Sequence, residues 1–98
     1  MKINFHQDNG TLNVALEGRL DTITAPELES FFSKNYDGKS ALRLDCADLT
    51  YISSAGLRVL LGAQKAMNKQ GEMVIRNINE TVKEIFEVTG FIDILTVE

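Results

Sequence analysis

Two runs near the start of the chain, 2–7 and 11–18, alternate between polar and apolar side chains. Their apolar positions, which fall on one side of each run, are Ile3 and Phe5, then Leu12, Val14 and Leu16. Such alternation is typical of strands that have one covered face. The intervening Asp8-Asn9-Gly10 is a turn signal, since Asn-Gly tolerates positive φ. The pattern predicts an N-terminal β-hairpin.

Three later segments place apolar residues at the i, i+3 and i+4 spacing of an amphipathic helix. Their stripes are Leu28, Phe31 and Phe32; Val59, Leu60, Ala63, Ala66 and Met67; and Val82, Ile85 and Phe86. The first helix begins at 24–27, where Thr24 and Glu27 predict a capping box around Pro26. It is expected to end at Asp37-Gly38.

The other two helices also have recognisable ends. The second starts at Ser54 or Ala55 and is followed by Gly71, which suits the left-handed cap conformation. Asn79 is expected to cap the third helix, and Gly90 is expected to end it.

Further extended segments are predicted between and after the helices. Alternation predicts strands at 41–46 and 72–76, and a short extended stretch at 49–52 leads into the second helix. A last strand is predicted at 92–97. The resulting order is β-β-α-β-α-β-α-β. Alternating strands and helices favour parallel pairs with right-handed crossovers. We therefore expect an α/β fold, a mixed sheet covered by helices, in one domain over 1–98.

Composition and charge reduce the number of function classes that the chain can have. The 98 residues are 44% hydrophobic and 24% charged, which is ordinary for a globular domain. The net charge of −4 disfavours binding to nucleic acid. The first residues hold no apolar signal-like run, and no segment is long enough to cross a bilayer, so we expect a cytoplasmic protein without membrane insertion.

Catalytic motifs are missing from the sequence. It lacks a P-loop, G-x-G-x-x-G, G-x-S-x-G and H-E-x-x-H. His6 is the only histidine and has no predicted nucleophile beside it, and Cys46 is the only cysteine and occupies an apolar strand position. We therefore expect no enzyme activity, no metal site and no cofactor.

The junction before the second helix carries the clearest candidate chemistry. Ser53 or Ser54 can cap the helix by accepting a backbone N–H. A helix N-terminus also tolerates an anion, so a phosphate on Ser54 would leave the fold intact and add about −1.5 to −2 charges at the surface. Gly56 in the first turn suggests a close approach, either by a partner or by local packing.

Several stretches together resemble one known family. They are 49–61, which contains Ser53-Ser54-Ala55-Gly56-Leu57-Arg58, Gly18-Arg19-Leu20-Asp21 followed by Thr22, the helix start Ala25-Pro26, Gly71-Glu72, and Thr89-Gly90-Phe91. In this order they resemble STAS domains, the fold shared by sulfate-transporter tails and anti-sigma factor antagonists. The resemblance covers nearly the whole chain and implies a STAS-type sheet.

The resemblance also implies roles for single residues. The phospho-accepting serine of the family falls on Ser54. The preceding aspartate of the family falls on Ser53, which is therefore a rival phosphorylation site, and its following hydroxyl residue falls on Ala55. Asp21 corresponds to an acidic residue that helps partner binding, although a turn or cap carboxylate is an equal alternative. The implied partner-binding set is Asp21, Thr22, Ser53, Ser54, Ala55, Gly56, Leu57, Arg58 and Leu61.

The function implied is that of an anti-sigma factor antagonist. When Ser54 is unphosphorylated, the domain would bind an anti-sigma factor that is also a serine kinase of the histidine-kinase-like ATPase type. Phosphorylation would release it, and a PP2C-type phosphatase would reset the switch. One alternative is a small STAS subunit of another assembly, such as a lipid-transport ABC complex, and Leu57 and Leu61 could form the docking surface in either case. A nucleotide-binding or hydrolytic domain is a second alternative, which the absence of a Gly-rich phosphate loop disfavours.

Overall fold

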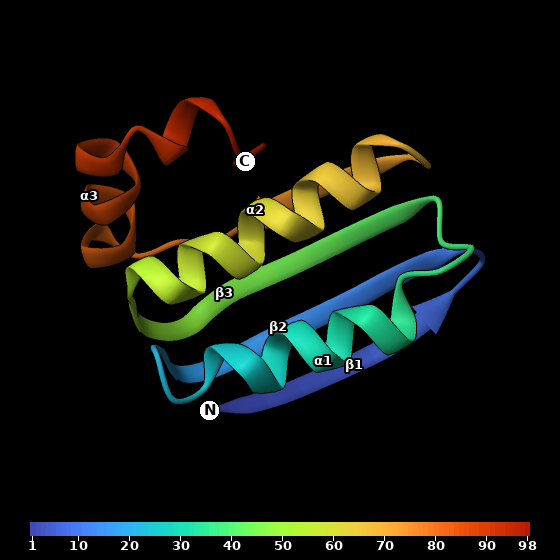
Figure 1. The fold of residues 1–98 in the computed structure, drawn as a ribbon, viewed down its shortest axis with the longest axis horizontal. Helices are drawn as coiled ribbons and strands as arrows, with labels where there is room; N and C mark the ends of the chain where they lie inside the picture. The colour runs from blue at the N-terminus through green and yellow to red at the C-terminus, as the bar shows by residue number, and fades with distance from the viewer.

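A four-stranded sheet in the order β1-β2-β3-β4 runs through the molecule (Figure 1). The structure is a computed structural model that describes residues 1–98. The strands are β1 Lys2–Asp8, β2 Thr11–Leu20, β3 Ala41–Ile52 and β4 Glu72–Arg76. β1 is antiparallel to β2, whereas β2, β3 and β4 are parallel. The mixed α/β sheet predicted from the sequence is confirmed.

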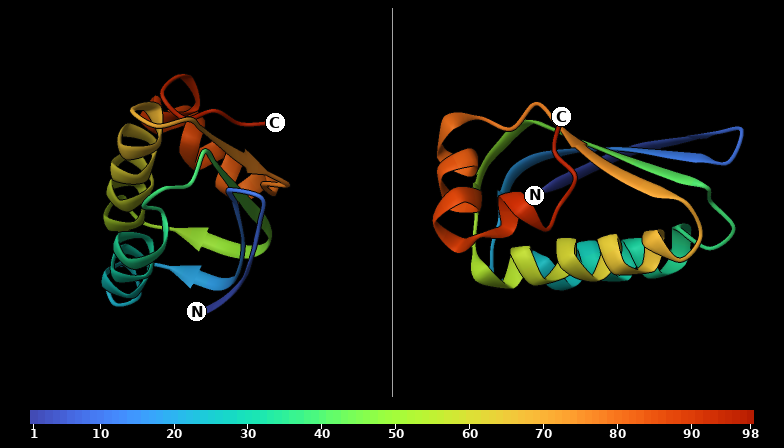
Figure 2. Two further views of the ribbon diagram at one scale, coloured as in Figure 1. Left: turned by 90° about the vertical axis from the view of Figure 1, so that its right-hand side faces the viewer. Right: turned by 90° about the horizontal axis from the view of Figure 1, so that it is seen from above.

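The helices cover one face of this sheet. They are α1 Ala25–Asn35, α2 Ser54–Asn68 and α3 Glu80–Thr89, followed by the 3-10 turn η1 Phe91–Asp93. α1 and α2 lie side by side under the sheet, α3 sits across one end, and the opposite face stays open (Figure 2). None of the helices combines the length and the apolar character that a bilayer crossing needs.

The hairpin and the core follow the predicted pattern. Asn9 and Gly10 have positive φ values of 49° and 81°, as a tight two-residue turn requires. The buried residues of β2 alternate up to Leu16 and those of β3 alternate from Leu42 to Cys46, and they belong to a core of 22 buried residues. Cys46 is fully buried in it, and desolvation, with a smaller effect of Asp45, raises the pKa of the thiol to about 12. The thiol is therefore a packing group.

The predicted strand 41–46 and the extended stretch 49–52 are one strand. β3 runs unbroken over 12 residues, and its register to β2 shifts between Ala15 and Glu17 and again between Gly18 and Arg19. Such irregularities bend a strand locally and redirect its end. The C-terminal part of β3 thereby leads directly into α2.

The prediction that Gly71 takes the left-handed cap conformation is wrong. Gly71 is not among the residues with positive φ. A Cβ atom there would instead overlap the backbone carbonyl of Ser40, which accepts the N–H of Glu72 at 3.1 Å. Glycine is therefore needed because two backbones approach closely.

The predicted last strand, 92–97, is also wrong. Residues 91–93 form η1, and the N–H of Leu95 donates to the carbonyl of Phe91 at 2.9 Å. Only one isolated bridge, between Val97 and Ile75, connects this segment to the sheet. The observed order is β-β-α-β-α-β-α, because Gly90 leads into another helical turn that buries Leu95 rather than Ile94.

Two glycines of α2 provide a matched test of packing. A Cβ atom on Gly56 would come within 2.7 Å of Leu20 Cγ and 2.9 Å of Ile52 Cγ1, whereas one on Gly62 would meet nothing within 4 Å. We expect Gly56→Ala to destabilise the fold by about 1–3 kcal/mol through overpacking. Gly62→Ala should stabilise it by roughly 0.5–1 kcal/mol through helix propensity. Urea unfolding of both variants measures the difference, and equal effects would contradict this account of Gly56.

Candidate functional site

Two chain junctions meet at one end of the sheet. The β2–α1 loop and the β3–α2 junction lie at the same end of the molecule (Figure 1). The N–H of Ser53 donates to the carbonyl of Leu20 at 2.9 Å, and the side chain of Leu20 packs against Gly56. The last residue of β2 is thus fixed to the first turn of α2. As in other parallel sheets, the carboxyl ends of adjacent strands bring their following loops together.

The two serines of the junction have different positions. Ser53 is the N-cap of α2, and its hydroxyl oxygen accepts the N–H of Gly56 at 3.4 Å. Ser54 is the first helical residue and is exposed. The sequence left the cap open between the two serines, and the structure assigns it to Ser53. The Ser54 hydroxyl makes no hydrogen bond within the chain.

The surroundings of Ser54 suit an added negative charge. The first turn of α2 contains no acidic residue, and its backbone N–H groups point toward the helix start. Arg58 is exposed one turn further along α2. Residues four apart lie on the same face of a helix, so the guanidinium of Arg58 shares a face with Ser54.

The β2–α1 loop is held by the carboxylate of Asp21. One of its oxygens accepts the N–H of Ile23 at 3.0 Å and the N–H of Thr24 at 3.1 Å. The predicted capping box of Thr24 and Glu27 is wrong. Thr24 Oγ1 is committed elsewhere, since it accepts the N–H of Asp21 and donates to the carbonyl of Arg19, each at 2.8 Å.

These contacts change the acidity of Asp21. The hydrogen bond from the Thr24 backbone is the largest influence and lowers the pKa of this carboxyl, while desolvation raises it in part. The N–H of Ile23, the Thr24 hydroxyl and the charge of Arg19 lower it further. Arg19 lies 3.7 Å from the carboxylate and stacks 4.4 Å from the ring centre of Tyr51. Asp21 is therefore an ionised loop anchor, in agreement with the alternative of a turn carboxylate.

A shallow groove runs from this end between α1 and α2. Its first part holds about 230 Å³ and is lined by Thr22, Ala25, Pro26, Glu29, Ala55, Arg58 and Val59. A second hollow of about 250 Å³ shares Glu29, Arg58 and Val59 and continues toward Gly62. The junction is therefore the end of a longer surface with both charged and apolar groups.

The predicted partner-binding residues divide by exposure. Thr22, Ser54 and Arg58 are exposed, and Asp21, Ser53, Ala55 and Leu61 are partly exposed. Gly56 and Leu57 are buried, with Leu57 3% exposed. Both residues face the core. They therefore pack under the junction and offer no side chain to a partner.

Ile23 is a surface residue that the sequence pattern did not single out. Its side chain is 86% exposed, the highest value among the large exposed apolar side chains. It lies in the loop that Asp21 holds, next to Thr22 at the groove. An apolar residue inside the polar run 21–24 is the sequence signal that could have revealed it.

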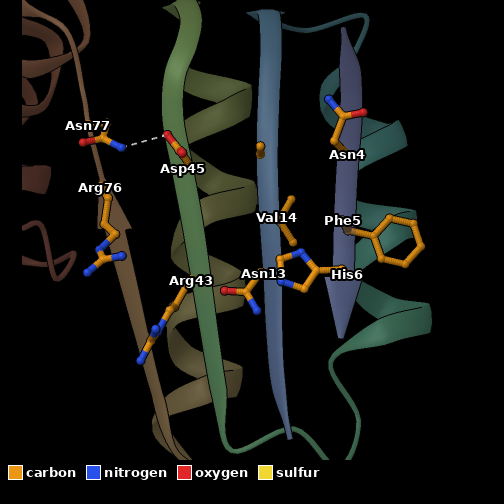
Figure 3. Close-up of a pocket in the computed structure, with 10 residues that line it drawn as sticks. Asn4, Phe5, His6, Asn13, Val14, Arg43, Asp45, Arg76 and Asn77 are labelled. Atoms are coloured by element: carbon orange, nitrogen blue, oxygen red, sulfur yellow. Dashed lines mark hydrogen bonds between the residues drawn. The ribbon is translucent and has the colours of Figure 1, made fainter. Parts of the chain in front are cut away.

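A further hollow lies on the open face of the sheet, away from this junction (Figure 3). It holds about 340 Å³ and is lined by Asn4, Phe5, His6, Asn13, Val14, Ala15, Arg43, Asp45, Arg76 and Asn77. Asn77 Nδ2 donates to Asp45 Oδ1 at 3.1 Å across its rim. The hollow contains none of the predicted site residues, and the structure has no cluster of three or more residues that could hold a metal ion.

Comparison with known proteins gives consistent matches along the chain. The family profile described as STAS domain matches residues 2–98. A candidate anti-sigma factor antagonist, BtrV of Bordetella bronchiseptica, is 37% identical over 99 residues, which cover 99% of this chain and 85% of the relative. The anti-sigma-B factor antagonist of Listeria monocytogenes is 30% identical over 95 residues, covering 94% of this chain and 82% of the relative.

Solved structures share the fold. An anti-sigma factor antagonist from Mycobacterium paratuberculosis superposes with a TM-score of 0.86 at 21% identity, covering 98% of this chain and 83% of the other. The Bacillus cell fate determinant SpoIIAA in its phosphorylated form gives a TM-score of 0.76 at 16% identity, covering 99% of this chain and 91% of the other.

The anchoring role of Asp21 predicts a pH effect. Its folded-state pKa lies below 3.8, so its stabilising contacts are complete above that value and are lost as pH falls through the folded pKa. We expect Asp21→Asn to be less stable than wild type at neutral pH, with a difference that shrinks in acid. Side-chain NMR titration and urea unfolding measure both effects. Asp37→Asn, in the exposed loop after α1, serves as the control variant. A titration midpoint of the Asp21 carboxyl at or above 3.8 would contradict its role as a loop anchor.

Proposed function

The chain belongs to the STAS domain family, and we propose that it acts as an anti-sigma factor antagonist whose binding to its partner is switched by phosphorylation of Ser54. The observation that carries this proposal is that one serine caps α2 and a different serine faces the solvent at its start. Ser53 holds the helix end, while the Ser54 hydroxyl is exposed and unbonded. Relatives that are named anti-sigma factor antagonists support the choice of partner class.

In its unphosphorylated form, the domain binds the anti-sigma factor through the groove end described above. The exposed groups there are Thr22, Ile23, Ser54 and Arg58, with Asp21, Ser53, Ala55 and Leu61 partly accessible. Such a surface combines an apolar anchor with polar and charged groups around it, as recognition surfaces commonly do. Binding of the antagonist occupies the anti-sigma factor and frees the sigma factor, which places the circuit in the cytoplasm.

Phosphorylation then ends the complex. The anti-sigma factor is proposed to be a serine kinase of the histidine-kinase-like ATPase type, and it transfers the γ-phosphoryl group of ATP to Ser54 Oγ. The new group adds about −1.5 to −2 charges at the centre of the contact surface. The helix N-terminus and Arg58 accommodate this charge within the domain, so the fold persists while the interface is lost.

Reversal requires a second enzyme. A phosphatase of the PP2C type is proposed to hydrolyse the phosphoserine and return the domain to its binding form. The chain is the substrate of both reactions, and we assign it no catalytic step. Ser53 is a poorer acceptor than Ser54, because its hydroxyl is only partly exposed and already accepts the N–H of Gly56, whereas the Ser54 hydroxyl is exposed and unbonded.

The Ser54 assignment is tested with a pair of neighbouring variants. Incubation with the cognate kinase and ATP should add one phosphate to wild type and to Ser53→Ala, and none to Ser54→Ala, as measured by mass spectrometry. Ser53→Ala should lose about 0.5–2 kcal/mol of stability with the cap, whereas Ser54→Ala should not. Ser54→Asp should bind the kinase more weakly while melting close to wild type. A phosphate found only on Ser53, or none on wild type, would overturn the assignment.

Ile23 provides an independent test of the contact surface. Burial of an isoleucine side chain in a complex contributes about 1.5–3 kcal/mol, so Ile23→Ala should weaken binding of the anti-sigma factor by about ten- to a hundredfold. Stability should not change, since the side chain is 86% exposed. Val88→Ala is the matched control, because Val88 is 77% exposed on α3, outside the groove. Equal affinities of the two variants in calorimetry would remove Ile23 from the interface.

A further inference from the structure

The two edges of the sheet are covered differently. At the β4 edge, the N–H of Ile75 donates to the carbonyl of Thr96 at 2.8 Å, and the N–H of Glu98 donates to the carbonyl of Ile75 at 2.9 Å. The segment 96–98 therefore shields part of that edge. β1 pairs with β2 on one side only, and its other side is an uncovered edge of seven residues (Figure 2). Such an edge presents unpaired backbone groups to another strand.

The side chains of β1 are complementary to a second copy of the same strand. Lys2 and Asp8 are at its two ends, and no side chain between them carries a charge when His6 is neutral. If two copies pair antiparallel around a two-fold axis at Phe5, Lys2 of one copy faces Asp8 of the other. Opposite charges at facing positions stabilise an antiparallel pair. Edge charges usually prevent pairing, but here they have opposite signs and would attract.

The apolar residues of β1 point to the same arrangement. Phe5 is 51% exposed and stands edge-to-face on Phe31 of α1, with ring centres 4.8 Å apart. Beside it lies a hollow of about 400 Å³ lined by Ile3, Glu27, Ser30, Phe31, Lys34 and Asn35. With the two-fold axis at Phe5, the two Phe5 rings and the two hollows would meet. Paired aromatic residues on facing strands are favourable contacts.

The outer face of α1 shows a second, independent complementarity. Glu27 near its start and Lys34 near its end are both exposed, and both line the hollow beside β1. The same two-fold axis would set the two α1 helices antiparallel, with Glu27 of one copy toward Lys34 of the other. In both α1 and β1, the charges at the two ends are opposite in sign, as a single two-fold symmetric contact requires.

We propose that β1 and the outer face of α1 form a self-association surface for a second copy of this chain. The two β1 strands pair antiparallel and join both sheets into one continuous sheet with α1 beside α1 on one face. Because the two β1 strands run in opposite directions, the surface around Ser54 of one copy and that of the other lie at opposite ends of the joined sheet. Each of these surfaces therefore stays accessible. The dimer would therefore offer two binding surfaces at once, and this inference does not depend on the function proposed for Ser54.

A charge exchange on β1 tests the proposal. Sedimentation equilibrium of the whole chain at low salt, from micromolar to millimolar concentration, should show a monomer–dimer equilibrium. Lys2→Asp and Asp8→Lys should each raise the dimer dissociation constant about tenfold, because each puts like charges opposite one another twice in the dimer. The double variant Lys2→Asp/Asp8→Lys should return close to wild type. Little monomer stability is at risk, since the contact of Lys2 with Glu17 is exposed and 3.9 Å long.

Controls and contrary outcomes are well defined. Lys83→Asp and Glu84→Lys make the same charge changes on exposed positions of α3 and should leave the dimer unaffected. Backbone amide shifts on dilution should concentrate in β1 and α1. A wild type that stays monomeric at millimolar concentration would overturn the proposal. So would a double variant as weak as the single variants, or a dimer whose shifts lie on other elements.

Discussion

The contact of Leu20 with Gly56 is the constraint on which the candidate site depends. The carbonyl of Leu20 accepts the N–H of Ser53, and its side chain occupies the space that a Cβ on Gly56 would need. Only glycine lets the first turn of α2 lie this close to the end of β2. The same contact fixes the distance between the β2–α1 loop and the start of α2. Asp21 and Ile23 therefore share one surface with Ser54, which lies far from them in the chain.

Most of the fold could be predicted because its elements have local signals. The alternation of β2 and the spacing of apolar residues in α2 match the faces that are buried. Asn79 caps α3 through the N–H of Val82, and Gly90 ends it with a φ of 80°. The prediction of a last strand at 92–97 was wrong because the short apolar run of this segment fits a strand or a helical turn equally well. Tertiary contacts decide it, including the bond from the N–H of Thr96 to the buried Gln64.

The site was less accessible to sequence reasoning, for a different reason. Which serine caps α2 depends on where β3 ends, and a shift of one residue exchanges the two roles. The bond between Ser53 and Leu20 sets that end through a partner in β2 that no local pattern reveals. The same is true of Asp21 and Thr24. Both are plausible caps by residue type, and only the path of the chain from Arg19 shows that the carboxylate holds the loop.

The division of roles between Ser53 and Ser54 has a thermodynamic consequence for the proposed switch. A helix cap contributes about 0.5–2 kcal/mol, and a domain of this kind has only about 5–15 kcal/mol of net stability. A kinase that used the cap residue would first have to break the bond from the Gly56 N–H and expose the Ser53 hydroxyl, so phosphorylation would work against part of that stability. A phosphate one residue later leaves the bond between Ser53 and Gly56 in place and lies where the helix favours negative charge. The free energy of the modification can then act on the interface alone, so one fold can serve as both the binding and the released form.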